Sequence, residues 1–403
     1  MTRSLAVGFA IAAVGAGLAP DSLSAQRLEW GAQLVGAWHA VDRTPDGGAL
    51  REFRIVQPVA TLMGRLGPHF GVRATANLEG LTIPDGELLL GGWGEGFVDR
   101  RHPHTYLHEL VAEATTDVGC GRIRCRLGAF VGKGFVPFGS DDPMSRPFLR
   151  FPVNHHLAQI LERAVVGLQA GGGIVTVEGA LFNGDEPEGP GQWPRIAGRF
   201  GDSWAARVTV EPIDGVELAG SAAGVASPEH RPGAGADQDK VHLGLRVDRA
   251  LGRGRVRGLA EWARTSELDG FFVFSCRLAE IGWSGRRLAV HYRAEATDRP
   301  EEERTEPFRS ARPHLENSIL GITRWTTQTV GLVGRLGSRA GGGRLDGIVE
   351  LTRGRVGTRQ AGAFDPRVTY GGEMFWSVSL GLRVAVNMAD HRMGRYALQA
   401  AHH

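Results

Sequence analysis

The stretch FGVRATANLE, residues 70–79, decides the fold class of this chain. Apolar residues occupy every second position, and polar residues or glycine stand between them. The apolar set is Phe70, Val72, Ala74, Ala76 and Leu78. The intervening set is Gly71, Arg73, Thr75, Asn77 and Glu79. Because successive side chains of a strand point to opposite faces, this two-residue period predicts a β-strand with one apolar face.

Similar segments recur along almost the whole chain, separated alternately by long connections and short turns. The predicted strands are residues 28–40, 55–66, 70–79, 106–116, 122–132, 164–170, 175–181, 204–210, 216–222, 241–247, 256–262, 271–281, 288–296, 319–336, 345–353 and 374–386. An even count of about 16 strands and this alternation are typical of outer-membrane barrels, whose turns face the periplasm and whose loops face outward.

Residues 1–25 have the features of a secretory signal peptide, with Arg3, an apolar run over residues 5–19 and small residues before a cut after Ala25. No later apolar run approaches the roughly 20 residues that a spanning helix needs. The sequence therefore predicts an all-β fold, a transmembrane antiparallel barrel in the bacterial outer membrane. We expect one domain over residues 26–403, with 388–403 as a C-terminal tail. A periplasmic β-sandwich is the rival fold.

The bulk composition identifies no partner. The formal net charge is +2, and removing residues 1–25 does not change it. We therefore expect no nucleic-acid partner, and because no nucleotide-binding glycine motif is present we expect no cofactor. Cys120 and Cys125 bracket a turn and are spaced for a disulfide in an oxidising periplasm, whereas Cys276 stands alone.

The connection over residues 133–163 is the strongest functional candidate, because it is long and rich in aromatic residues. Its apolar side chains favour burial, so we expect it to fold inward and narrow a water-filled lumen. Apolar spacing predicts about two turns of helix over residues 155–163. The alternative is an extracellular cap without a role in passage. The constriction candidates are Lys133, Asp141, Asp142, Arg146, Arg150, His155 and His156.

The stretch VGKGFVPFGSDDP, residues 131–143, resembles the entry to the third loop of bacterial outer-membrane porins, especially the phosphate-selective type. The order of strand, long inward loop and strand at the fifth and sixth positions also resembles general trimeric porins. The resemblance implies homotrimers and diffusion of small solutes. The chain departs from it in two respects. Lys133 and Lys240 are the only lysines, and the last strand is followed by a tail in which Tyr396 is the nearest aromatic residue.

The parity opposite the apolar one is expected to face the lumen, and its charges are mixed. Ion pairs explain many of these residues, whereas Arg122, Arg124, Arg126, Arg255 and Arg257 are the only sign of an anion path. The lumen-facing candidates are Arg73, Glu79, Glu109, Glu113, Arg124, Arg126, Arg207, Arg246, Arg255, Arg257, Glu261 and Arg293.

Other chemistry has little support in the sequence. His102, His104 and His108 have a spacing compatible with zinc, but no further ligand completes the set, so we predict no metal site. Ser140 or Ser145 with His155 would be needed for hydrolysis, and nothing in their spacing requires it. We therefore predict no catalytic residues. The charged run at residues 301–304 is interpreted as part of a solvated loop over residues 297–313.

These observations predict a channel, not an enzyme, through which small hydrophilic solutes diffuse passively or with weak selectivity. The expected partners are outer-membrane lipid and these solutes. The first alternative is a non-conducting barrel that serves as a surface scaffold or adhesin. The second is a barrel enzyme that acts on lipid.

Overall fold

The computed structural model describes residues 26–44, 48–84, 104–120, 123–153, 155–187, 189–227, 235–306, 309–310, 319–339, 342–360, 362, 364–388 and 392–400. The signal peptide expected at residues 1–25 lies outside this range and remains a prediction. Among the described residues, no helix is both long enough and apolar enough to cross a membrane.

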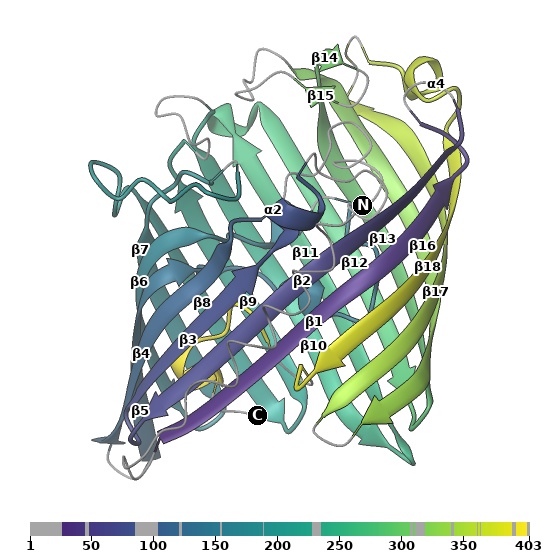
Figure 1. The fold of residues 1–403 in the computed structure, drawn as a ribbon. Coiled ribbons are helices and arrows are strands. Elements are labelled where there is room, and N and C mark those ends of the chain that lie inside the picture. The colour runs from purple at the N-terminus through teal and green to yellow at the C-terminus, as the bar shows by residue number, and fades with distance from the viewer. Residues whose placement is uncertain are drawn as a thin grey trace.

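The described strands form one closed antiparallel barrel of 16 strands (Figure 1). Its first eight strands are β1 (Gln26–Val41), β2 (Leu50–Leu66), β3 (Phe70–Asn77), β4 (Leu107–Cys120), β5 (Ile123–Gly134), β6 (Arg163–Gly172), β7 (Val175–Phe182) and β8 (Ser203–Ile213). The others are β9 (Val216–Val225), β10 (Gln238–Leu251), β11 (Gly254–Glu267), β12 (Phe272–Ser284), β13 (Leu288–Glu302), β16 (Ile319–Arg339), β17 (Gly343–Gln360) and β18 (Met374–Val386). The predicted antiparallel barrel of about 16 strands is confirmed, and the sandwich alternative is wrong.

Pairing between neighbours in sequence builds most of the sheet, and β1 closes it against β18 over residues 32–41 and 377–386. The short elements outside the wall are β14 (Arg304–Glu306), β15 (Arg309–Ser310), α2 (Glu79–Thr82), α4 (Pro366–Thr369) and 3-10 turns at Pro143–Ser145, His155–Ala158, Leu268–Gly270 and Ala397–Ala400. Hairpin turns such as 173–174 and 252–253 gather at the lower end of Figure 1, and we call it the turn end. The long connections with β14 and α4 lie at the other end (Figure 1).

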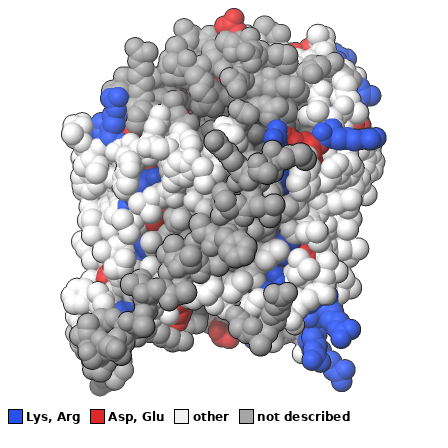
Figure 2. All heavy atoms as spheres, viewed as in Figure 1, with Lys and Arg blue, Asp and Glu red and all other residues white. Residues whose placement is uncertain are grey.

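Alternation along each strand gives the barrel an apolar outer surface. On β18, Trp376, Leu380 and Leu382 are exposed, whereas Ser379 and Arg383 on the opposite parity are buried. The described part of the face in Figure 2 is mostly uncharged along the wall, with arginine side chains near both ends. An apolar band between polar ends is the surface that a barrel presents to lipid.

Several strands extend beyond their predicted ends, but β3 is shorter than predicted. It stops at Asn77, whose side-chain oxygen accepts a hydrogen bond from the Glu79 backbone N at 3.0 Å. Such a local contact competes with continued pairing. Glu79 therefore lies on α2 rather than on a strand, although its side chain is fully buried.

Two other sequence predictions about local structure are wrong. Residue 301 does not belong to a solvated loop, because β13 runs through Glu302 and Glu301 is buried, accepting a hydrogen bond from Thr323 Oγ1 at 2.5 Å. The two helical turns predicted for residues 155–163 are reduced to one 3-10 turn. A continued helix would use the Ala158 carbonyl oxygen as an acceptor, but this oxygen accepts a hydrogen bond from Ser140 N at 3.1 Å.

Part of the interior is an apolar core rather than a water-filled space. Phe135, Phe138 and Met144 pack there against inward-facing residues of the wall such as Phe130 and Phe182. Residues from the C-terminal segment join the same cluster, namely Met393 and Tyr396. The core lies under β2–β9, so this side of the barrel is filled by the chain itself.

Candidate functional site

Residues 133–163, which we call the constriction segment, contact inward-facing side chains around much of the barrel. Gly139 N donates to Ser221 Oγ of β9 at 2.9 Å, and Leu149 N donates to Glu350 Oε1 of β17 at 2.7 Å. Its large apolar side chains are buried. These side chains are Phe135, Phe138, Phe148, Leu149 and Phe151. Contacts to strands that are far apart in the sequence hold the segment across the interior.

Arg146 and Arg293 converge on one carboxylate, Glu280 of β12. Arg146 Nη1 lies 3.1 Å from Glu280 Oε1, and Arg293 Nη2 lies 2.7 Å from the same oxygen. The Arg293 guanidinium also stacks 3.9 Å above the centroid of the Phe148 ring. Burial lowers the pKa of Arg146, but attraction to Glu280 outweighs this effect and raises the pKa above its ordinary value. The Arg146 guanidinium is therefore charged at any pH at which the protein folds.

The remaining constriction candidates are also bonded rather than free. Arg150 Nη1 donates to Ser377 Oγ at 2.8 Å, and the Asp142 side chain accepts from Met144 N at 2.7 Å. Lys133 Nζ donates to Thr105 Oγ1 at 2.5 Å. His155 is buried in the 3-10 turn, and its neighbour His156 is half-buried, with Nδ1 3.5 Å from Glu186 Oε2.

Glu162 is the centre of a buried polar cluster at the end of the constriction segment. Its Oε1 accepts hydrogen bonds from Thr105 N at 3.0 Å and Thr105 Oγ1 at 2.7 Å, and lies 2.8 Å from His108 Nδ1. Burial opposes the charged form, but His108, Lys133 and Thr105 lower the pKa of Glu162. A buried, ionised carboxylate with these partners is satisfied without a ligand.

His104, His108 and Glu162 place one possible metal-ligand atom each within 4.8 Å of one another. His102, the third histidine of the motif, lies outside the described residues. Since three donors already occupy Glu162 Oε1 and the Lys133 ammonium is close, the cluster fits a cation poorly. The prediction of no metal site stands as a prediction.

The serines considered for hydrolysis are engaged by other groups. Ser145 Oγ donates to Asp142 O at 2.6 Å, and Ser140 Oγ accepts from Arg146 Nη2 at 2.9 Å. The Ser145 hydroxyl donates to a backbone carbonyl oxygen, which is not the arrangement of a hydroxyl activated by a base.

Several lumen-facing candidates on the wall are buried beside a partner. Arg207 makes a two-bond contact with Glu178, at 2.5 Å and 2.9 Å. Glu261 Oε2 lies 3.5 Å from His242 Nε2. The structure places Arg73, Glu109 and Glu113 against the C-terminal segment.

The arginines considered for an anion path lie near the turn end. Arg246, Arg255 and Arg257 surround Asp248, and the last two side chains are about half exposed. Arg126 is also exposed and pairs with Asp117 at 2.8 Å. The Arg124 side chain and the whole of Arg122 lie outside the described residues.

A cavity of about 670 Å³ lies between the constriction segment and the turn end. Its described lining contains eleven arginines and five carboxylates. Some of the arginines come from β11, β16, β17 and β18, and others from the constriction segment and the C-terminal segment. The described lining therefore carries an excess of positive charge. We call it the turn-side cavity.

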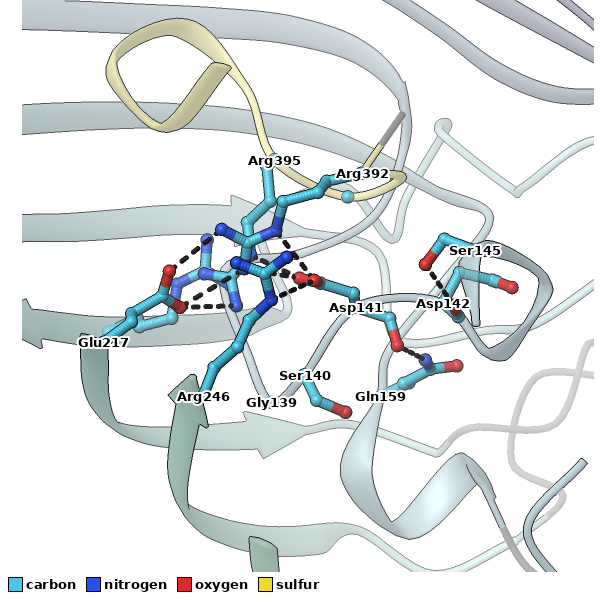
Figure 3. A network of polar contacts seen from close by, with 12 residues as sticks. Gly139, Ser140, Asp141, Asp142, Ser145, Gln159, Glu217, Arg246, Arg392 and Arg395 are labelled. Atoms are coloured by element: carbon cyan, nitrogen blue, oxygen red, sulfur yellow. Dashed lines mark hydrogen bonds and ion pairs between the residues drawn. The ribbon is translucent and has the colours of Figure 1, made fainter. Parts of the chain in front are cut away.

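Residues 392–400, which we call the tail, contact the constriction segment and the wall through Arg392 and Arg395 (Figure 3). Arg392 donates to the Asp141 carboxylate from Nε at 2.7 Å and from Nη2 at 2.9 Å, and its Nη1 donates to Glu217 Oε2 at 2.9 Å. Arg395 Nε donates to Asp141 Oδ1 at 2.8 Å. Asp141 belongs to the constriction segment and Glu217 to β9, so the tail ties the segment to the wall. Although burial raises the pKa of Asp141, Arg392 and Arg395 hold it well below its ordinary range.

The role of Glu217 and of the tail was missed by sequence reasoning. Glu217 lies on the inward-facing parity of β9, but no periodicity marks residues 392–400. The available signal was the spacing of Arg392, Arg395 and Tyr396 after the last strand, which has no obvious use in an extended tail.

The disulfide prediction is only partly covered by the described residues. Cys125 is disulfide-bonded and Cys276 is a buried free thiol. The side chain of Cys120 lies outside the described residues.

No protein-family model and no curated protein matches the chain. Among solved structures it is similar to a loop L8 deletion mutant of OmpT, an outer membrane protein of Vibrio cholerae, with 9% identity, a TM-score of 0.49 and coverage of 90% of this chain and 100% of that one. It is also similar to an anion-selective porin from Comamonas acidovorans, with 12% identity, a TM-score of 0.44 and coverage of 90% of this chain and 100% of that one. A third similar structure is OpdO of Pseudomonas aeruginosa, with 11% identity, a TM-score of 0.38 and coverage of 89% of this chain and 97% of that one. The barrel assignment rests on the strand order of this chain itself.

Proposed function

We propose that this protein is an outer-membrane channel for small hydrophilic solutes, with the constriction segment setting the width of the path. The observation that carries the proposal is the combination of a closed barrel, an apolar outer surface and a charged interior that is not completely filled. Polar groups inside a barrel hold water and solutes, while the outer band contacts lipid. We expect no enzymatic activity, and the porin resemblance suggests a homotrimer.

The charge of the turn-side cavity supports a preference for anions. Arginine outnumbers Asp and Glu in its lining, and some of these arginines, such as Arg255 and Arg257, have partly exposed side chains. Arginine binds carboxylate and phosphate groups with two parallel hydrogen bonds. Small anions with either group are therefore the solutes that we expect to pass most readily.

Planar-bilayer recording of the purified, detergent-folded protein tests the channel. We expect discrete conductance steps, from either the full chain or a form without the tail. Deleting residues 140–150 from the tail-free form is expected to increase the step, because this part of the segment crosses the interior. A control substitution in an exposed turn, Arg253→Gln, should leave the step unchanged. If no form conducts, the protein is not a channel.

A non-conducting scaffold is the second candidate, and one observation favours it. The tail and the constriction segment together build an apolar core inside one side of the barrel. If this core fills the path, the intact chain is closed. Silence of both the intact and the tail-free protein in the bilayer, with binding of the folded barrel to surface ligands, would support a scaffold.

A further inference from the structure

Side chains of the barrel wall bind the backbone of the tail. Its backbone forms no strand, so its polar groups would be unsatisfied if they were buried against apolar residues. Instead, Glu109 Oε1 accepts from Gly394 N at 3.2 Å, and Glu113 Oε2 accepts from Ala397 N at 2.9 Å. Gln169 accepts from Leu398 N at 2.9 Å and donates to Tyr396 O at 3.1 Å.

The side chains of the tail are recognised as specifically as its backbone. Two guanidinium groups lie between Asp141 and Glu217, and Arg395 Nη2 is 3.4 Å from Glu217 Oε1. The Tyr396 hydroxyl donates to Glu109 Oε1 at 2.7 Å and accepts from Phe135 N at 2.9 Å. Bidentate contacts with arginine fix the geometry of both partners as well as their charge.

The wall also provides the space that the tail occupies. A Cβ built on Gly134 would lie 2.2 Å from the Tyr396 hydroxyl oxygen, and one on Gly128 would lie 3.2 Å from Ala397 Cβ. Both glycines are on β5, on the inward parity. The absence of a side chain at these positions creates a groove for Tyr396 and Ala397.

We propose that the lumen contains a receptor site for a basic peptide, occupied in this structure by residues 392–398 of the same chain, and that this segment is a displaceable plug. The regulatory role of this plug rests on the channel function proposed above. Its ligand class is an unstructured peptide with two arginines three residues apart, the second followed by tyrosine.

The position of the site explains why occupancy would control passage. Arg392, Met393 and Arg395 line the turn-side cavity, so the tail borders the space through which solutes would move. Asp141 connects the tail to the constriction segment. Departure of the tail would therefore widen the path and also leave the segment less firmly attached to β9. The ion pairs that anchor the tail are largely buried, so salt screens them only weakly and should leave the tail in place.

The main experiment compares the full chain with a variant that lacks residues 389–403, in planar bilayers. We expect at least a twofold larger conductance step from the variant. A synthetic peptide of residues 389–403, added to the turn side, should restore the smaller step. The matched control peptide carries R392Q and R395Q, and should block at least tenfold more weakly.

Binding of the fluorescently labelled peptide to the truncated barrel in detergent is measured in parallel, by anisotropy. Binding of the native peptide at least tenfold tighter than the control supports the receptor site. If the truncated barrel conducts as the full chain does and binds no peptide, the plug is wrong while the channel stands. If neither form conducts, the channel proposal fails and peptide binding still decides the receptor site.

A full-length variant avoids dependence on the folding of the truncated chain. A Cβ at Gly128 would lie 3.2 Å from Ala397 Cβ, so Gly128→Cys with Ala397→Cys can form a disulfide once the tail shifts slightly to make room for the new side chain. Oxidation should cross-link them and keep the conductance low below about pH 4, where the free tail is expected to leave, and reduction should let the conductance rise. The control pair, Gly179→Cys with Ala397→Cys, should not cross-link, because nothing lies within 4 Å of a Cβ at Gly179. Equal cross-linking of both pairs, or of neither, overturns the proposed position of the tail.

Discussion

Arg207 and Glu178 face each other on β8 and β7 and are both almost completely buried, at 2% relative exposure each. Removing water from both charges is costly, and the two short hydrogen bonds offset that cost only while both partners are present. The exposed pair of Arg367 and Asp365 has similar geometry, with a contact at 3.1 Å, but water screens it. The same type of contact therefore has different consequences inside and outside the barrel.

Glu178→Gln should destabilise the folded barrel by about 3 kcal/mol, because it leaves the Arg207 guanidinium buried without its counter-charge. The urea midpoint of the heat-modifiable folded band on a gel measures the change. Asp365→Asn is the matched control and should leave the midpoint within error. Equal midpoints for the two variants would contradict the role assigned to burial.

Metal removal should have no effect on stability. Glu162 Oε1 already receives hydrogen bonds from Thr105 and contacts His108, so Zn²⁺ would have to displace bonded donors. We expect the same unfolding midpoint with excess EDTA and with added zinc. Stabilisation by zinc that is lost in His104→Ala would instead identify the cluster as a metal site.

At the scale of elements, the constriction segment and the tail depend on each other through Asp141. The folded-state pKa of this carboxyl is depressed by Arg392 and Arg395, against the effect of burial. A depressed carboxyl pKa contributes stability above its unfolded value near 4, and this stability is lost as pH falls through the lower folded value.

The tail should therefore remain docked at pH 5 and be released only below about pH 4. Protease cleavage of the tail, followed by mass spectrometry across the pH range, measures its release. Asp141→Asn should release the tail at pH 7 as well. A tail that detaches between pH 5 and 7 in the unmodified protein would contradict this assignment.

Gly139 fixes the path of the constriction segment. Its φ is +71°, and a Cβ there would lie 1.8 Å from Ala158 O. Gly173, in the turn between β6 and β7, also has a positive φ, of +59°, but nothing lies within 4 Å of its Cβ position. Gly139 is therefore required both by its positive φ and by the lack of space for a side chain, whereas Gly173 is required only by its positive φ.

Gly139→Ala should destabilise the protein by several kcal/mol or displace the segment, since backbone atoms cannot move aside as a flexible side chain can. Gly173→Ala should cost only about 1 kcal/mol, the penalty for the left-handed conformation. Urea midpoints of the two variants and proteolysis within residues 140–150 test the difference. Similar midpoints and unchanged proteolysis would show that Gly139 tolerates a side chain.

For the whole molecule, the effect of charge on ions depends more on where the charges lie than on the net charge. The chain carries a formal charge of only +2, yet arginines predominate around the turn-side cavity. Charge that lines a narrow space in a low-dielectric wall acts on passing ions more strongly than charge on an open surface.

In a salt gradient, the reversal potential of the conducting form should therefore have the sign of anion preference. Arg383→Gln removes a buried positive charge from the cavity lining and should reduce that potential. Arg367→Gln removes the same charge from an exposed loop and should not. Cation preference in the unmodified protein would contradict the assignment.

The sequence by itself determined the barrel. A two-residue period, as in residues 70–79 and 374–386, reports which side chains face lipid and which face inward, and it does so strand by strand without knowledge of the partners. Hairpin order then follows from short turns, so the count of about 16 strands and the closed sheet followed from local information.

Only the tertiary structure decided what the inward-facing residues do. Asp141, Glu217 and Arg392 lie far apart in the sequence and meet because closure of β1 on β18 brings the last residues of the chain back to the lumen. Glu109 and Gln169 pair with backbone groups of the tail, and no periodicity records such a pairing. Periodicity depends on the solvent that each face meets, whereas ion pairing depends on three-dimensional proximity, and only folding establishes that.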